Sequence, residues 1–148
     1  MNKYSSLKLD NQLCFSLYAL SREIIKLYKP MLDELNLTYT QYIVMIVLWE
    51  EEKASVKHIG NRLHLDSGTL TPLLKKLESM ELIKRYRDKS DDRVVIAELT
   101  EKGTSLKEKA IDIPKKVLCN IKLPLEEAID LKRSLDNLLE NLEWLYIN

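Results

Sequence analysis

Two cysteines carry the most reactive side chains of this 148-residue chain, Cys14 and Cys119. A thiol can bind zinc, form a disulfide or be oxidised by a peroxide. The cysteines are far apart, and the two histidines, His58 and His64, have no ligand spacing. The sequence therefore predicts no metal site and no cofactor. From the residues alone, the favoured interpretation of Cys14 is a buried structural thiol.

A second set of polar side chains lies between Ser55 and Met80, a stretch with the pattern of two short helices joined by a tight turn. Ser55 is a good N-cap for the first helix, and Asp66 or Ser67 for the second, after a turn at His64-Leu65-Asp66. Apolar residues recur at helical spacing in both: Val56, Ile59 and Leu63, then Leu70, Leu73, Leu74 and Leu77.

The other face of the second helix carries short hydroxyls followed by lysines: Ser67, Thr69, Thr71, Lys75 and Lys76. Such a face suits a helix that enters a DNA major groove N-terminus first. Thr69, Thr71 and Lys75 are the candidates for the groove, and Ser67 and Lys76 for phosphates. The alternative is a helical hairpin with a solvated polar face. Pro72 falls inside this helix, four residues after Gly68, whose backbone can adjust.

Two runs rich in β-branched and aromatic residues follow, Leu82 to Arg87 and Arg93 to Leu99, around a polar turn. They predict a β-hairpin, which directly after two such helices is the wing of a winged helix. The loop and its shoulders hold four basic residues: Arg85, Arg87, Lys89 and Arg93. Arg93, near the tip, could probe a narrow minor groove. The alternative is a solvated turn in which Asp91 and Asp92 pair with neighbouring arginines.

Helices are predicted on both sides of this module. An amphipathic helix runs from about Asp10 to Tyr28, and Pro30 is expected to end or bend it. Thr38 and Gln41 resemble the capping box of a helix from Tyr39 to about Glu51. The core residues expected from that second helix are Ile43, Ile46, Val47 and Leu48.

After the hairpin, Thr100 caps a predicted helix from Glu101 to about Ile121, with a kink at Pro114. Pro124 begins the last helix. This helix has a heptad seam longer than a small domain needs, which we interpret as part of a dimerisation layer. The alternative is an internal helix of a monomeric bundle. The seam consists of Ala128, Leu131, Leu135, Leu138, Leu142 and Leu145.

Composition and charge agree with a small nucleic-acid-binding protein. The chain is 45% hydrophobic and 31% charged with only three glycines, which indicates a mostly helical globular domain. It has no run of about 18 apolar residues and no signal-peptide pattern, so we expect a cytoplasmic protein without a membrane partner. Net charge is zero, but Val56 to Arg93 carries nine basic and six acidic residues. A basic module between acidic flanks favours salt-sensitive DNA binding.

The predicted fold is mainly α with a small β-hairpin wing, in one domain over residues 1–148. Residues 38–100 form the winged helix-turn-helix module. Residues 10–36 and 101–148 supply the N- and C-terminal dimerisation helices, which suits a protein that binds a two-fold symmetric operator.

The order of elements and several strings resemble the MarR family of winged-helix repressors over nearly the whole chain. Asp91-Asp92-Arg93 and the segment Leu99 to Gly103 look like the wing of that family and its exit. Three longer strings look like the OhrR branch, whose members sense organic hydroperoxides through one N-terminal cysteine. These strings are Leu9 to Phe15, Leu37 to Tyr42 and Leu65 to Glu78.

The resemblance implies a role for Cys14. In the family this cysteine is a thiolate that an organic hydroperoxide oxidises to a sulfenic acid, while tyrosines from the partner subunit hydrogen-bond it. Tyr28 and Tyr39 occupy the matching positions, and Tyr18 and Phe15 are expected as pocket walls. A helix N-terminus and phenol donors favour a thiolate, and an apolar pocket prefers an alkyl peroxide to hydrogen peroxide.

The resemblance also implies a role for Cys119. Relatives with two cysteines carry a resolving cysteine late in the helix before the last one, near Cys119, whereas other relatives are locked by a small-molecule thiol. We therefore expect an intersubunit Cys14–Cys119 disulfide after oxidation, with the small thiol as the alternative. Either product adds bulk or a covalent tie at the dimer interface, shifts the wings and recognition helices, and lowers operator affinity.

The expected function is that of a redox-sensing transcriptional repressor. It binds a pseudo-palindromic double-stranded operator as a homodimer and is released when organic hydroperoxides oxidise Cys14. A regulator of the same type that responds to another oxidant, or to a small aromatic ligand in the dimer cleft, is the first alternative. A thiol peroxidase is disfavoured because Cys14 has no nearby arginine or threonine, so no enzyme is expected. A helical adaptor without DNA contact would tolerate replacement of Thr69, Lys75 and Arg93.

Overall fold

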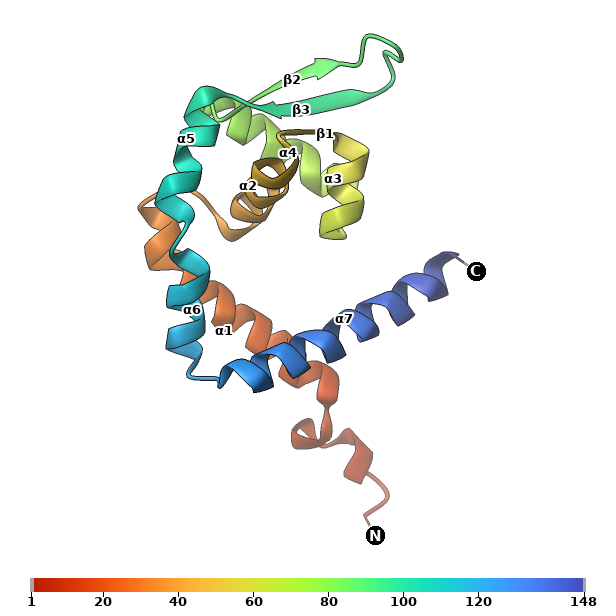
Figure 1. Cartoon of the computed structure of the whole chain (residues 1–148). Helices are drawn as coiled ribbons and strands as arrows, with labels where there is room; N and C mark the ends of the chain where they lie inside the picture. The colour runs from red at the N-terminus through yellow and green to blue at the C-terminus, as the bar shows by residue number, and fades with distance from the viewer. Residues whose placement is uncertain (1, 148) are drawn as a thin grey trace. The chain divides into compact units, whose positions relative to one another are not determined.

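The computed structural model describes residues 2–147, and the side chains of residues 2–143. The chain divides into two compact units, Met1–Ile113 and Pro114–Asn148. The elements, labelled in Figure 1, are two 3-10 helices, η1 Ser5–Leu7 and η2 Leu9–Asn11, followed by α1 Leu13–Asp33, α2 Tyr39–Glu51, β1 Lys53–Ser55, α3 Val56–Leu63, α4 Ser67–Ser79, β2 Ile83–Arg87, β3 Val95–Leu99, α5 Glu101–Ala110, α6 Ile113–Ile121 and α7 Leu125–Ile147.

The start of α2 is fixed by the predicted capping box. The backbone N–H of Gln41 donates to the Thr38 hydroxyl at 3.3 Å, and the N–H of Thr38 donates to Oε1 of Gln41 at 3.0 Å. Two otherwise unpaired donors at the helix start are thereby satisfied.

The helix-turn-helix has the predicted boundaries. The Ser55 hydroxyl accepts the backbone N–H of His58 at 3.1 Å and starts α3. His64 ends that helix in the left-handed region at φ 54°. Oδ1 of Asp66 accepts the N–H of Thr69 at 2.7 Å, so Asp66 rather than Ser67 caps α4.

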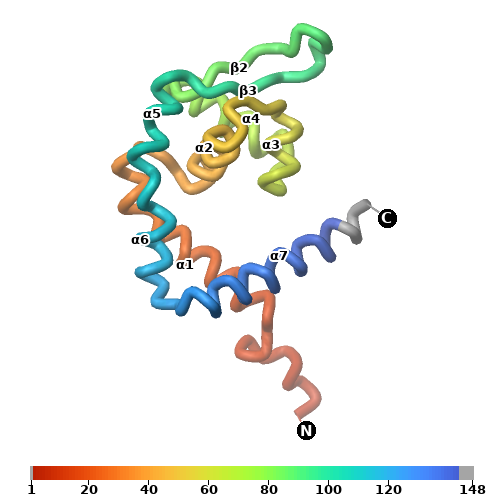
Figure 2. Tube along the Cα trace, viewed as in Figure 1, coloured from red at the N-terminus to blue at the C-terminus, as the bar shows by residue number. Residues whose placement is uncertain are grey.

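The sheet has three antiparallel strands in the order β1-β3-β2. The predicted hairpin is present as β2 and β3, with Arg85 opposite Ala97, and Figure 2 traces it to its tip. On the other side of β3, β1 pairs with its Ala54 opposite Ala97. The strand β1 was not predicted because three residues are too few to show an alternating pattern.

The core of the first unit lies between α2, α3, α4 and the sheet (Figure 1). Its fully enclosed side chains include Leu48 of α2, Ile59 of α3 and the α4 stripe Leu70, Leu74 and Leu77, all at 0% exposure. This stripe holds α4 by one face and leaves the other face to solvent.

Three predictions about the helices need correction. First, α1 begins at Leu13 rather than near Asp10, because Leu9–Asn11 forms the 3-10 helix η2. Second, α1 continues through Pro30 to Asp33. Proline lacks only the N–H that would bond to the carbonyl of Lys26, and the helix continues for three more residues. Third, Ile46 is 39% exposed and is not a core residue of α2.

The predicted kinked helix from Glu101 to Ile121 is two helices. The first, α5, ends at Ala110, and α6 starts at Ile113. Pro114 is in the first turn of α6, where a residue without an N–H costs no hydrogen bond. A proline that was expected to bend one helix therefore helps to start another.

In the second unit, α7 carries the predicted heptad seam. Ala128 and Leu135 are half-buried, whereas Leu131, Leu138 and Leu142 are exposed. The side chain of Leu145 lies outside the described part of the chain. Over residues 2–147, no helix is both long and apolar enough to cross a membrane.

Gly103, in the first turn of α5, allows a close approach of the Leu82 backbone. A methyl group there would overlap the carbonyl oxygen of Leu82, just before β2. We expect Gly103→Ala to lower the free energy of unfolding by about 1–3 kcal/mol, as an overpacked site does. Urea denaturation followed by circular dichroism measures this. Gly68→Ala is the matched control, because its nearest neighbour is the Asp66 side chain at 3.2 Å. An equal loss of unfolding free energy in both variants would contradict a specific overlap between position 103 and the Leu82 carbonyl.

Candidate functional site

The outer face of α4 carries most of the predicted DNA-contacting side chains. Ser67, Thr69, Lys75 and Lys76 are exposed. Thr71 is half-buried and lines a cleft of about 590 Å³ between α3, α4 and the wing, together with Arg85 and Arg93. Ser67 also borders this cleft, so two of the predicted hydroxyls face the wing, whereas Thr69, Lys75 and Lys76 do not line it.

The wing tip is ordered by its own hydrogen bonds. Oδ1 of Asp88 accepts the backbone N–H groups of Ser90 at 2.7 Å and Asp91 at 3.2 Å. Nη1 of Arg87 donates to the backbone carbonyl of Asp92 at 2.6 Å. Short-range bonds of this kind hold a loop in one conformation before any partner binds.

Arg93 is paired with Asp91 and still faces solvent. Its Nε and Nη2 each donate to a carboxylate oxygen of Asp91 at 3.0 Å, a two-point geometry. The Arg93 side chain is nevertheless 87% exposed. Hydrogen bonds from Arg93 lower the pKa of Asp91. The Asp91–Arg93 pair, which the sequence offers as the alternative to a DNA contact, is therefore present. It also orients the exposed guanidinium of Arg93.

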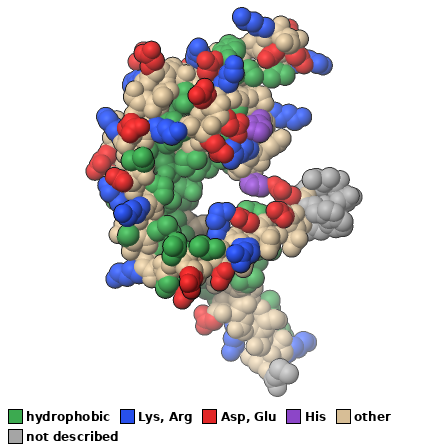
Figure 3. Space-filling view, in the orientation of Figure 1, with side chains coloured by type: hydrophobic (Ala, Val, Ile, Leu, Met, Phe, Trp, Pro, Cys, Tyr) green, Lys and Arg blue, Asp and Glu red, His purple; other side chains and the backbone are tan. Residues whose placement is uncertain are grey.

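Other basic residues of the module are bonded to acidic neighbours. Nε of Arg85 donates to Oε2 of Glu78 at 2.8 Å and ties β2 to α4. Nη1 of Arg62 lies 3.0 Å from Glu50 and 2.6 Å from Glu51, across α3 and α2. On the face drawn in Figure 3, acidic and basic side chains are intermingled. The exposed basic side chains of α4 and the wing are Lys75, Lys76, Lys84, Arg87, Lys89 and Arg93.

Cys14 is the second residue of α1 and is exposed, as is Cys119 in α6. The prediction from the residues alone, that Cys14 is a buried structural thiol, is therefore wrong within one chain. Phe15 is 43% exposed and Tyr18 57% exposed, and both lie within a turn of Cys14 on α1. Nη1 of Arg22 donates to the Tyr18 hydroxyl at 2.8 Å.

A cluster of tyrosines lies at the other end of α1. The ring centroids of Tyr28 and Tyr39 are 5.0 Å apart, edge to face. Tyr42 joins them at 5.8 Å from Tyr28 and 6.3 Å from Tyr39. Burial raises the pKa of Tyr28 to about 12, with Tyr39 and Tyr42 adding to the shift. Tyr42 was missed in the sequence, although it follows Tyr39 at helical spacing.

Cys14 and Tyr28 are on the same helix, about 20 Å apart along its axis at a rise of about 1.5 Å per residue. The phenols of one chain therefore cannot reach the thiol of that chain. Any site that combines Cys14 with Tyr28 and Tyr39 requires a second copy.

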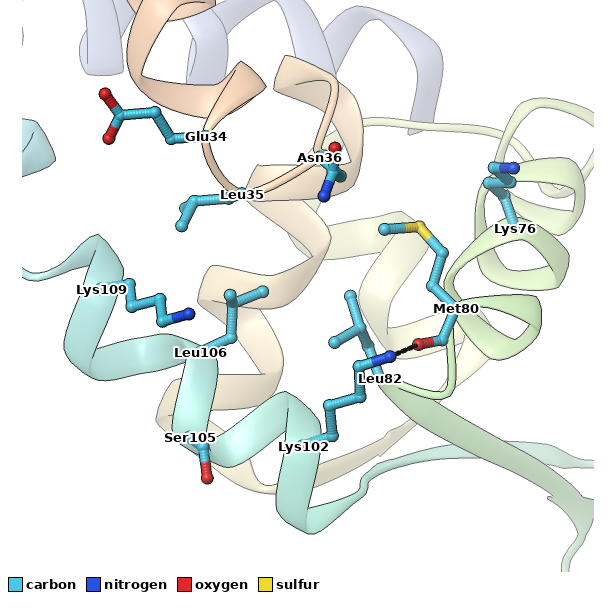
Figure 4. Close-up of a pocket in the computed structure, with 10 residues that line it drawn as sticks. All are labelled: Glu34, Leu35, Asn36, Lys76, Met80, Leu82, Lys102, Ser105, Leu106 and Lys109. Atoms are coloured by element: carbon cyan, nitrogen blue, oxygen red, sulfur yellow. Dashed lines mark hydrogen bonds between the residues drawn. The ribbon is translucent and has the colours of Figure 1, made fainter.

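A further pocket of about 730 Å³ lies between the end of α1, the end of α4 and α5 (Figure 4). Leu35, Leu82 and Leu106 give it apolar walls. Nζ of Lys102 donates to the carbonyl of Met80 at 2.8 Å and closes one side. Of the predicted site residues, only Lys76 lines it. Among the described residues, no group of three His, Cys, Asp or Glu could hold a metal ion.

The raised pKa of Tyr28 predicts a stability change at high pH. The unfolded chain releases the phenolic proton near pH 10 and the folded chain near 12. The contribution to stability is therefore complete below pH 10 and is lost as pH rises through about 12. Urea denaturation between about pH 9 and 12 should show a smaller decline for Tyr28→Phe than for wild type. Tyr18→Phe, an exposed tyrosine of the same helix, should follow wild type, and parallel curves for all three proteins would contradict the prediction.

Comparison with known proteins gives the same family as the fold. The family model of the transcriptional regulators SarA/Rot matches residues 26–110. The organic hydroperoxide resistance transcriptional regulator of Bacillus subtilis (strain 168) is 53% identical over 141 residues, which are 95% of this chain and 96% of that protein.

Among solved structures, reduced AbfR bound to DNA superposes with a TM-score of 0.78 at 37% identity, covering 95% of this chain and 98% of that one. AbfR is a protein of Staphylococcus epidermidis. Its disulfide form matches with a TM-score of 0.65 at 37% identity, over 93% of this chain and 96% of that one. The chain therefore belongs to the SarA/Rot family of transcriptional regulators, has the winged helix-turn-helix fold of MarR, and is similar over nearly its whole length to a regulator of organic hydroperoxide resistance.

Proposed function

We propose that this protein is a redox-sensing transcriptional repressor, which binds operator DNA as a homodimer and leaves it when an organic hydroperoxide oxidises Cys14. The observation that carries the proposal is the separation of an exposed thiol at the start of α1 from Tyr28, which lies near the end of the same helix and packs with Tyr39 and Tyr42 of α2. Such an arrangement makes a sensor only when two chains meet. The similarity to a regulator of organic hydroperoxide resistance supports the choice of oxidant.

Contacts with the operator come from α4 and the wing. Thr69 and Lys75 read or border the major groove from the outer face of α4, with Thr71 facing the cleft to the wing. Ser67 and Lys76 bind flanking phosphates. Arg93 enters the minor groove, and Arg87 and Lys89 bind the backbone beside it. Arg85 acts indirectly, because its bond to Glu78 joins the wing to α4.

The dimer uses residues 10–36 and 101–148, with the winged-helix module at 38–100 between them. Exposed apolar side chains support this division: Leu13 is 71% exposed in α1, and Leu131, Leu138 and Leu142 are 40–45% exposed in α7. Exposed leucines at heptad spacing are covered in a dimer. Two recognition helices related by a two-fold axis then match a pseudo-palindromic operator.

The chemistry at Cys14 is a two-electron oxidation. The thiolate attacks the outer oxygen of the hydroperoxide, the O–O bond breaks, and the alkoxide takes a proton and leaves as an alcohol. The sulfenic acid then reacts with a second thiol, losing water and forming a disulfide. Cys119 of the partner is the proposed second thiol, and a small-molecule thiol is the alternative. Each chain is oxidised once, so this is a switch and not a catalytic cycle.

Wild type should lose at least tenfold in operator affinity after treatment with cumene hydroperoxide, whereas Cys14→Ser should keep its affinity. The measurement is a gel shift with a duplex selected from random sequences by the reduced protein. Non-reducing electrophoresis identifies the thiol that pairs with Cys14. A covalent dimer should form in oxidised wild type and be absent in Cys119→Ser. A dimer band that persists in Cys119→Ser would exclude the pairing, and release of DNA by Cys14→Ser would exclude the sensor.

Replacing Arg93 tests DNA binding independently of the response to hydroperoxide. Arg93→Ala should weaken operator binding by about tenfold, the value of one groove contact, and lower the salt dependence. The response to hydroperoxide should be unchanged. Lys84→Ala is the matched control, because Lys84 is an exposed wing lysine that lies 3.3 Å from Glu98. Equal losses of operator affinity in the two variants would mean that the wing contributes only non-specific electrostatic attraction to DNA.

A further inference from the structure

A row of aromatic rings continues from the tyrosine cluster along α2. Tyr42 contacts both Tyr28 and Tyr39 on one side. On the other side its ring is 6.2 Å from that of Trp49, in an edge-to-face arrangement. Tyr42 is only 3% exposed. Because Tyr42 and Trp49 lie two turns apart on the same face of one helix, they move together when α2 moves.

Trp49 is bonded to α5 in two ways. The indole Nε1–H donates to the carbonyl of Gly103 at 2.9 Å. Nζ of Lys107 donates to the carbonyl of Trp49 at 3.0 Å. The residues involved are more than 50 positions apart in sequence, so these bonds join helices and not neighbours within a turn.

The α5 end of this connection is locked to the base of the wing. A side chain at Gly103 would overlap the carbonyl of Leu82, so α5 and the start of β2 are in direct contact. The Thr100 hydroxyl donates to the carbonyl of Glu81 at 2.6 Å and accepts the N–H of Gly103 at 3.0 Å. The N–H of Thr100 donates to the carbonyl of Leu82 at 3.1 Å. The strand β2 begins directly after Leu82, and β3 ends directly before Thr100. Both wing strands are therefore joined to the residues that contact Gly103.

We propose that Trp49 is a positioning residue that couples the tyrosine cluster to the wing through its hydrogen bond to Gly103. The inference rests on the proposed function, because it needs a switch at Cys14 that acts on Tyr28 and Tyr39. It adds the route from that switch to the DNA-binding surface, which lies on the far side of the core.

The coupling follows from packing. When oxidation of the partner's thiol displaces the phenols of Tyr28 and Tyr39, Tyr42 has no space around it and must shift with them. That shift turns or slides α2 and carries the indole of Trp49. The hydrogen bond from the indole N–H then either moves Gly103, together with β2 and β3, or breaks. In both cases the wing of the oxidised dimer occupies a different position relative to α4.

A second tie between α2 and the wing keeps the coupling from depending on Trp49 alone. The N–H of Leu99 donates to the carbonyl of Glu52, the residue that follows α2, at 3.0 Å. Removing the indole N–H should therefore reduce the response to oxidation without abolishing it.

The test is Trp49→Phe, which keeps a ring beside Tyr42 and removes the donor to Gly103. The quantity measured is the ratio of operator dissociation constants after and before cumene hydroperoxide. Affinity of the reduced protein should stay within about threefold of wild type. The ratio should be about threefold to tenfold smaller than in wild type, the amount one hydrogen bond contributes to an equilibrium constant.

Lys102→Met is the matched control, because it removes one hydrogen bond of α5, to the carbonyl of Met80, that does not involve the aromatic row. It should respond to hydroperoxide like wild type. If wild type itself does not respond, the proposed function fails. If wild type responds and Trp49→Phe responds to the same extent, or Lys102→Met loses as much as Trp49→Phe, the role of Trp49 is excluded.

Fluorescence gives a readout that does not depend on DNA. The chain has two tryptophans, so Trp144→Phe leaves Trp49 as the only indole. Emission from Trp49 should change when this variant is oxidised, and should stay constant when Cys14→Ser is added. Oxidation of Cys14 without a change in Trp49 emission would overturn the proposal even if DNA is released.

Discussion

The unbroken helix α1, which carries both Cys14 and Tyr28, is the constraint on which the proposed switch depends. A helix of this length cannot fold back, so Cys14 at its start and Tyr28 near its end stay about 20 Å apart in every state of one chain. Chemistry at the thiol can reach the phenols only across an interface. In the proposed switch, sensing and dimerisation are therefore one property, because the thiol of a monomer would be exposed without the phenols of a partner beside it.

The helix-turn-helix and the wing could be predicted well because short-range chemistry determines them. Thr38 with Gln41, Ser55 and Asp66 begin their helices through hydrogen bonds to residues three positions away, which the sequence alone displays. The leucine stripe of α4 identifies its buried face for the same reason. Prediction failed at two prolines, because the effect of a proline depends on its position within the helix. Pro30 continues α1 and Pro114 starts α6, although both residues look like interruptions of a helix.

The site was predicted less completely than the fold. Family resemblance selected Tyr28 and Tyr39, but Tyr42 and Trp49 have no motif, and only packing brings them beside that pair. Likewise, the sequence contains nine basic residues between Val56 and Arg93 but cannot tell which are bonded inside the protein. Arg62 and Arg85 are held by glutamates from other elements, pairings that separations of 7 to 12 residues do not disclose.

The Asp91–Arg93 pair has a consequence for the thermodynamics of recognition. An arginine that is free in solution loses rotamer entropy when DNA fixes it, and this loss opposes binding by up to about 2 kcal/mol. The carboxylate of Asp91 has already restricted Arg93 before DNA arrives. It also offsets the positive charge, which weakens attraction to phosphates in general. In the proposed complex, such a wing would select grooves of strong negative potential, since only a strong potential can compete with the Asp91 carboxylate for Arg93.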